Sequence, residues 1–287
     1  MRWVGRRQSE NIEDRRGMSR GGVVAAGGGL AGLAVLLVSY LLGVDVGGIL
    51  PQGGPETGGP VAERAAGPEE QRLRDFSATV LADTEDVWNE LFRQQTRRDY
   101  PEPTLVLFTG GINSGCGSAS SATGPFYCPS DRKVYLDLSF FEELARRFRA
   151  AGDFAQAYVI AHEVGHHVQN QFGVLNEVHS KQGRVSEAEY NRLSVRLELQ
   201  ADFLAGVWAH HAQRTKDILE PGDIEEALTA ASAIGDDRLQ RQAQGYVVPD
   251  AFTHGTSEQR VRWFKLGFDT GDLSKMMETF RVNYNSL

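Results

Sequence analysis

Residues 161–169, with the sequence AHEVGHHVQ, constrain this chain more than any other stretch. They contain the pattern H-E-x-x-H, in which His162 and His166 are four residues apart. Residues four apart on an α-helix project from the same face, so the two imidazoles can reach one metal ion. Zinc accepts imidazole nitrogen at about 2.0–2.1 Å. Glu163 follows the first histidine, where a general base would flank a water molecule on that ion.

A second segment, RLELQAD at residues 196–202, can complete such a site. A catalytic zinc needs three protein ligands and one open position, and Glu198 can supply the third ligand from a second helix. Asp202 lies one turn further along the same face, where it can accept the free N–H of a ligand histidine and fix its tautomer. Each segment alone also fits an ordinary amphipathic or charged helix, but together they favour a metal site.

Several strings of this chain resemble those of the bacterial neutral zinc metallopeptidases. They extend over nearly the whole chain and are MRWVGRRQSENIEDRRG, GPFYCPSDRKVYLDLSFF, AHEVGHHVQNQ, RLELQADFLAGVWAHH and FTHGTSEQRVRWFKLGF. The resemblance implies a membrane-anchored, gluzincin-type metalloprotease in which two histidines and a glutamate bind Zn2+. No ligand position departs from that pattern, so the resemblance implies His162, His166 and Glu198 as the ligands. It implies peptidase activity more firmly than it implies any substrate.

The composition excludes some functions. Hydrophobic residues make up 41% of the 287 residues, which suits the core of one large domain or two small ones. The net charge of −8 argues against a nucleic-acid partner, which would need a basic patch.

The two cysteines, Cys116 and Cys128, are either unrelated buried thiols or a disulfide formed in an oxidising compartment. A zinc site built from them is disfavoured, because the C-x-x-C spacing is absent.

The N-terminal region predicts a membrane anchor. Residues 21–44 contain no charge, and as a helix they would be about 36 Å long, enough to cross a hydrocarbon core of about 30 Å. Residues 1–20 are rich in arginine, so we expect them to stay on the cytoplasmic side of the bacterial membrane. The catalytic domain would then be periplasmic or extracellular. Residues 45–68, rich in glycine and proline, predict a flexible linker.

We expect residues 69–287 to form an α+β, mainly helical, zincin-like metallopeptidase domain with a small β-sheet. Apolar spacing predicts a helix over 70–98, and the segments 104–109 and 133–138 are typical of strands. Capping residues predict further helices that start near Ser139, Asp153, Ser186 and Asp223. In gluzincin-like folds an edge strand above the active helix holds the substrate backbone. By analogy of position, residues 133–138 are either that edge strand or an interior strand.

His254 is a further candidate for catalysis. It precedes a helix that begins at Ser257, in a glycine-containing loop from which a side chain can reach into a site. Peptide hydrolysis builds an oxyanion, which a positioned imidazole or phenol can stabilise. His254 is our first candidate for this role and Tyr246 the second. The alternative is that His254 only makes hydrogen bonds within its own loop.

These observations predict a membrane-anchored zinc endopeptidase that acts on a peptide or protein substrate. Zinc would activate a water and polarise the scissile carbonyl, and Glu163 would act as general base. One alternative is a membrane-tethered, non-catalytic binding or scaffold protein with a structural or vestigial zinc site, which a closed set of four ligands would favour. Another is a hydrolase of cell-wall amide bonds, which uses the same chemistry and differs in the shape of its cleft.

Overall fold

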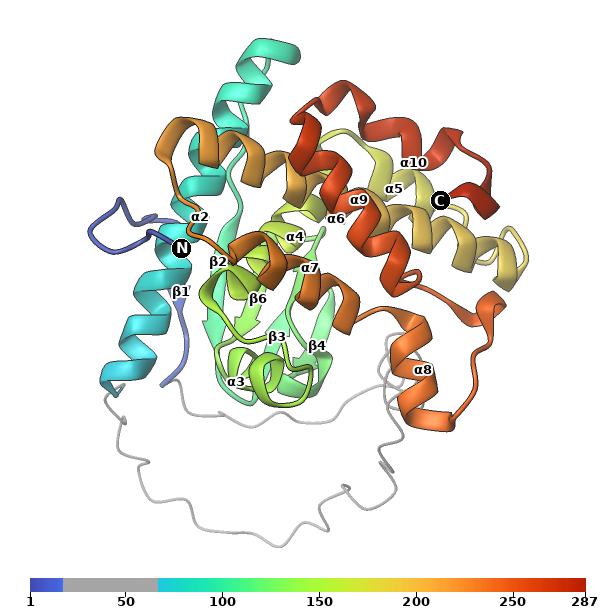
Figure 1. The fold of residues 1–287 in the computed structure, drawn as a ribbon, viewed down its shortest axis with the longest axis horizontal. Coiled ribbons are helices and arrows are strands. Elements are labelled where there is room, and N and C mark those ends of the chain that lie inside the picture. The colour runs from blue at the N-terminus through green and yellow to red at the C-terminus, as the bar shows by residue number, and fades with distance from the viewer. Residues whose placement is uncertain (18–66) are drawn as a thin grey trace, which may run out of the picture.

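The computed structural model of the chain describes residues 1–17 and 67–287. This part is mainly helical with a small sheet, which lies in the lower half of Figure 1 beside α2. The strands are β1 (Ile12–Asp14), β2 (Thr104–Phe108), β3 (Gly111–Ser114), β4 (Gly117–Ser120), β5 (Phe126–Cys128) and β6 (Lys133–Asp137). The α-helices are α2 (Pro68–Gln95), α3 (Ser139–Arg146), α4 (Asp153–Gln171), α5 (Val174–His179), α6 (Glu187–Lys216), α7 (Asp223–Ala233), α8 (Asp236–Gln244), α9 (Ser257–Thr270) and α10 (Glu278–Arg281).

The main sheet has the strand order β1-β2-β6-β5, and β3 and β4 form a separate hairpin. Strand β2 pairs in parallel with both of its neighbours, whereas β5 runs antiparallel to β6. Leu105, Val106 and Leu107 of β2 are all fully buried, as expected for a strand that is covered on both faces. Residues 133–138 therefore supply an interior strand, and the sheet edge on that side is β5.

The first 17 residues are part of the folded body. Strand β1 pairs in parallel with β2, which lies far from it in the sequence. Arg7 Nη1 lies 3.0 Å from Oε2 of the buried Glu85 on α2. Arg6 Nη2 lies 2.6 Å from Oδ1 of Asp83 on the same helix. Paired strands lie about 4.8 Å apart, so a bilayer cannot separate them. The expected localisation, with residues 1–20 cytoplasmic and the domain on the other side of a membrane, is therefore wrong.

The expected fold class also needs correction. Within the two described ranges, no helix has both the length and the apolar character that a membrane crossing requires. The predicted transmembrane helix, residues 21–44, lies outside the described residues, as does the predicted linker up to residue 66. In place of a domain preceded by a single membrane-spanning helix, the structure shows a mainly helical body with a small sheet.

Two glycines allow α6 to approach its neighbours closely. A Cβ atom on Gly267 of α9 would lie 2.0 Å from the carbonyl oxygen of Phe203 on α6, so only glycine fits there. Gly165 lies between the two histidines of the H-E-x-x-H pattern. A Cβ atom on it would lie 3.0 Å from the carbonyl oxygen of Ala201 on α6. Helices α4 and α6 are therefore nearly in backbone contact, which sets the distance between their facing side chains.

Cys116 and Cys128 form a disulfide, which confirms the bridged alternative. The bridge joins the turn between β3 and β4 to the edge strand β5. Its sequence separation is 12 residues, so it closes a short loop.

We expect the Cys116→Ser/Cys128→Ser double variant to lose about 3 kcal/mol of unfolding free energy, because the bridge restricts the unfolded chain. Urea unfolding followed by circular dichroism, with the oxidised wild type alongside, measures this loss. Equal free energies of unfolding in the two proteins would show that the bridge contributes no stability.

Candidate metal centre

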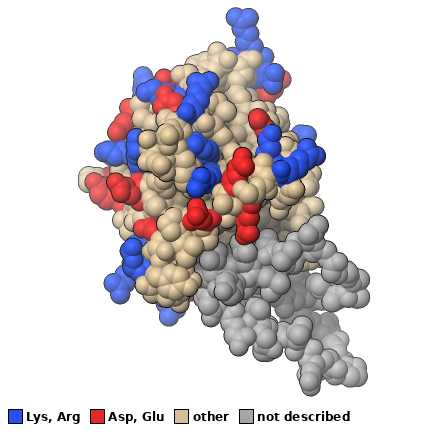
Figure 2. Space-filling view, turned by 90° about the vertical axis from the view of Figure 1, so that its right-hand side faces the viewer, with Lys and Arg blue, Asp and Glu red and all other residues tan. Residues whose placement is uncertain are grey.

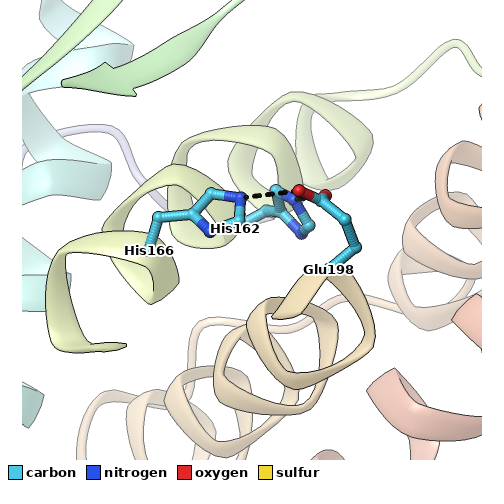
Figure 3. Close-up of side chains that lie close together, drawn as sticks. All are labelled: His162, His166 and Glu198. Carbon is cyan, nitrogen blue, oxygen red and sulfur yellow. Dashed lines mark hydrogen bonds and ion pairs between the residues drawn. The ribbon is translucent and has the colours of Figure 1, made fainter. Parts of the chain in front are cut away.

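Three donor groups from two helices converge at one point. His162 and His166 project from α4, and Glu198 projects toward them from α6 (Figure 3). Nε2 of His162 lies 3.2 Å from Oε2 of Glu198, and Nε2 of His166 lies 3.5 Å from Oε1. One ligand atom from each residue lies within 4.8 Å of the other two. Ligands on a tetrahedral zinc ion are about 3.3 Å apart, given bond lengths of about 2.0–2.1 Å, so this donor set fits the ion.

Asp202 determines how His162 faces this point. Its Oδ1 lies 2.9 Å from His162 Nδ1, and its carboxylate also accepts hydrogen bonds from Tyr158 and from Arg260 Nε at 2.8 Å. Burial raises the pKa of Asp202, but the charge of Arg260 and the contact with His162 outweigh it, and the pKa is lowered. A carboxylate can only accept, so Nδ1 of His162 carries a hydrogen. In the neutral ring this leaves the lone pair on Nε2, the nitrogen that faces Glu198.

The electrostatics of the donor set favour a cation. Burial opposes ionisation of Glu198, but the charge of His166 and the hydrogen bonds from His162 and His166 hold its pKa well below the usual value. Burial lowers the pKa of His162, but Asp202 and Glu198 together raise it to about 9. Protons therefore stabilise this cluster, and a bound metal ion would displace them.

Glu163 lies beside these three residues in the wall of a cavity of about 440 Å³. Its side chain is buried, and within the described part of the chain its carboxylate makes no hydrogen bond or ion pair. A carboxylate without a fixed partner is free to exchange a proton with a molecule in the cavity. The apolar part of the wall includes Pro125, Phe126, Phe140 and Leu239.

His254 lines the same cavity, whereas Tyr246 is 62% exposed and lies outside its wall. Oδ2 of the buried Asp236 accepts the backbone N–H groups of Thr253, His254 and Gly255 at 2.7, 2.6 and 3.0 Å. Oδ1 of the same carboxylate lies 3.2 Å from His254 Nδ1. Burial lowers the pKa of His254, but the hydrogen bond and charge of Asp236 outweigh it, so the pKa is raised. Asp236 thus holds both the loop and the imidazole.

His167 points away from the donor set. It is fully buried, with Nδ1 3.0 Å from the hydroxyl of Tyr127 and Nε2 against the carbonyl oxygen of Pro101. Burial lowers the pKa of His167 to about 4, which keeps the ring neutral. This histidine connects α4 to the edge strand β5 and so stabilises the cavity wall.

Four residues of the site were not predicted from the sequence, namely Tyr158, Gln169, Asp236 and Arg260. Tyr158 precedes His162 by four positions and Gln169 follows His166 by three, so helical spacing alone could have found them. Arg260 comes from α9, which packs against α6, and no local pattern indicates this contact. Asp236 comes from the start of α8 and pairs with His254 in the loop before α9, and no local pattern indicates this contact either.

Two imidazoles lie on one helix and a carboxylate on a second, and the same cavity wall holds a glutamate without a partner among the described residues. Zinc-dependent hydrolases use this arrangement. The family described as "Putative neutral zinc metallopeptidase" matches residues 1–280. The chain therefore belongs to this family, which confirms the resemblance seen in its sequence.

Bacterial relatives cover most of the chain. It is 51% identical over 284 residues to the uncharacterized protein YpfJ of Escherichia coli strain K12, a match that covers 95% of this chain and 96% of that protein. It is 42% identical over 251 residues to the uncharacterized protein Rv2575 of Mycobacterium tuberculosis strain H37Rv, a match that covers 82% of each. No solved structure matches the chain.

Proposed function

We propose that this protein is a zinc-dependent peptidase that hydrolyses peptide bonds at the cavity next to α4. His162, His166 and Glu198 would hold the zinc ion. When bound there, zinc lowers the pKa of a water molecule toward 7 and polarises the scissile carbonyl group. The observation that carries this proposal is the convergence of the three donors beside Glu163, a carboxylate with no partner in the described chain.

In this proposal Glu163 is the general base. It accepts a proton from the attacking water and then donates it to the nitrogen of the leaving amine. His254 donates a hydrogen bond to the carbonyl oxygen as negative charge develops on it. The raised pKa of His254 supports this role, because a protonated imidazole is the better donor. Asp236 keeps the ring aimed at the cavity.

The edge strand β5 is the candidate for holding the substrate backbone. Phe126 and Tyr127 of β5 line the cavity, and among the described strands β5 has a paired neighbour on one side only. An extended peptide can add to such an edge through main-chain hydrogen bonds, with its alternate side chains facing the cavity. This edge supports a peptide, rather than a compact small molecule, as the proposed substrate.

We expect the wild type to purify with zinc and the His162→Ala variant to lose it, because two donors hold zinc far more weakly than three. Atomic absorption on dialysed protein measures the metal content. The matched control is His211→Ala, since His211 binds the carbonyl oxygen of Gly271 away from the site. Full zinc content in His162→Ala would contradict the ligand set.

Activity is measured by digestion of an unbiased peptide library, with products identified by mass spectrometry. Cleavage should disappear in the presence of a chelator and return when zinc is added back. A wild type that is loaded with zinc and cleaves no member of the library would contradict the proposed peptidase function.

A further inference from the structure

Gln169 connects the two helices of the candidate metal centre. It lies three residues after His166 on α4, and its side chain is fully buried. Oε1 of Gln169 lies 2.9 Å from Nδ1 of His166. Nε2 of Gln169 donates to the carbonyl oxygen of Leu197 on α6 at 2.6 Å. Leu197 immediately precedes Glu198, so one amide group contacts one candidate ligand and the backbone next to another.

The carbonyl group of Leu197 fixes the orientation of this amide. A carbonyl oxygen can only accept a hydrogen bond, so the NH₂ group of Gln169 must face Leu197. The amide oxygen then faces His166, and because that oxygen also can only accept, Nδ1 of His166 must carry a hydrogen. In the neutral ring Nε2 is left with its lone pair, and Nε2 is the nitrogen that faces Glu198.

His162 and His166 therefore reach the same tautomer by different means. The group that contacts Nδ1 of His162 is the carboxylate of Asp202, which is paired with Arg260. The group that contacts Nδ1 of His166 is a neutral amide, and among the described residues no charged side chain forms a hydrogen bond with that amide. Burial strengthens the amide contact, because no water can compete for either end of Gln169.

We propose that Gln169 is a positioning residue of the metal centre. It holds His166 in the tautomer that presents Nε2 to the metal, and it ties α4 to the residue before Glu198. This inference rests on the proposed function, since it assumes that His162, His166 and Glu198 bind zinc. Groups that orient ligand histidines in this way change metal affinity by about 10–100-fold when they are replaced.

The test compares two buried glutamines. Gln169→Leu removes both contacts at similar volume, and we expect its zinc affinity, measured by competition with a chromophoric chelator, to fall by about 10–100-fold. The control is Gln200→Leu. Gln200 is also fully buried and donates to the carbonyl oxygen of Met276 at 2.8 Å, but it touches neither histidine. We expect this control to lose stability and to bind zinc as the wild type does.

A second measurement separates positioning from a merely structural role. In zinc-loaded protein with ¹⁵N-labelled histidine, the Nδ1–H group of His166 should give an exchange-protected NMR signal in the wild type and in Gln200→Leu. We expect Gln169→Leu to lose this signal. Gln169→Glu keeps an acceptor for Nδ1–H of His166 but loses the donor to Leu197, so it should retain the His166 signal.

Three results would overturn the inference. They are equal zinc affinities in Gln169→Leu and Gln200→Leu, a protected His166 signal in Gln169→Leu, and the loss of that signal in Gln169→Glu. A wild type that binds no zinc would overturn the proposed function and this inference together. A wild type that binds zinc alongside any of the three results overturns the inference alone.

Discussion

The Glu163→Gln variant should bind zinc as the wild type does and cleave a peptide substrate about 10²–10⁴-fold more slowly, the usual contribution of a general base. The amide has the same shape as the carboxylate but does not accept a proton near neutral pH. Glu163 is not one of the three converging donors, so the metal content should not change. Initial rates on one peptide taken from the library digest, together with atomic absorption, measure both quantities.

The matched control for this experiment is Glu177→Gln. Glu177 is an exposed residue of α5 that does not line the cavity, so its substitution should leave the rate unchanged. If Glu163→Gln cleaves the peptide as fast as Glu177→Gln does, Glu163 is not the general base.

The largest loss of stability should follow the substitution Asp202→Ala. Asp202 and Arg260 are both buried, and two guanidinium nitrogens of Arg260 lie 2.8 and 3.0 Å from the Asp202 carboxylate. Removing the acid leaves a buried cation without its partner, which costs about 3–5 kcal/mol. Urea unfolding of the two proteins without metal measures this difference.

An exposed ion pair provides the control for Asp202→Ala. Asp250 is 73% exposed and pairs with Arg192 at 3.3 Å, so Asp250→Ala should cost no more than about 1 kcal/mol. Replacing both buried partners, as in Asp202→Leu/Arg260→Met, should recover part of the stability, because no unpaired charge remains. Zinc affinity should stay low in the double variant, since His162 still lacks the acceptor for Nδ1–H. Equal costs for Asp202→Ala and Asp250→Ala would contradict the role of the buried pair.

We expect substitutions of charged residues elsewhere on the surface to change the free energy of unfolding much less. Figure 2 shows basic and acidic side chains interspersed on the face that it presents. Exposed pairs such as Arg146 with Glu142 are screened by water and each contribute little. The charged groups with large expected effects are therefore those buried behind the donor set.

The sequence could predict those parts of the site that lie within one helix. Helical geometry fixes the relative positions of His162, Glu163 and His166, so their spacing alone places both rings on one face. The same holds for Glu198 and Asp202 on α6. Contacts between elements distant in sequence could not be predicted in this way. Arg260 reaches Asp202 only because α9 packs closely on α6.

For the fold, too, features that depend on local sequence could be predicted, whereas contacts between distant segments could not. Apolar spacing and capping residues predicted the helices that became α2, α4, α6 and α9. The N-terminal segment was misplaced, because its arginines are typical of a flank that remains on the cytoplasmic side of a membrane. In the structure Arg6 and Arg7 instead bind acids of α2, and β1 completes the sheet. An arginine that flanks a membrane helix and an arginine that pairs with an acid look alike in the sequence. The acids that pair with these two arginines lie far away in the sequence, so the local pattern could not indicate them.

X-ray absorption at the zinc edge of the purified wild type tests the central claim most directly. We predict two imidazole nitrogens at about 2.0–2.1 Å, carboxylate oxygen at about 2.0–2.2 Å and one further light ligand from solvent. Glu198→Ala leaves two of the three donors, so it should lose its zinc as His162→Ala does. Four protein ligands with no solvent position, or a first shell that does not contain two imidazoles, would contradict the account.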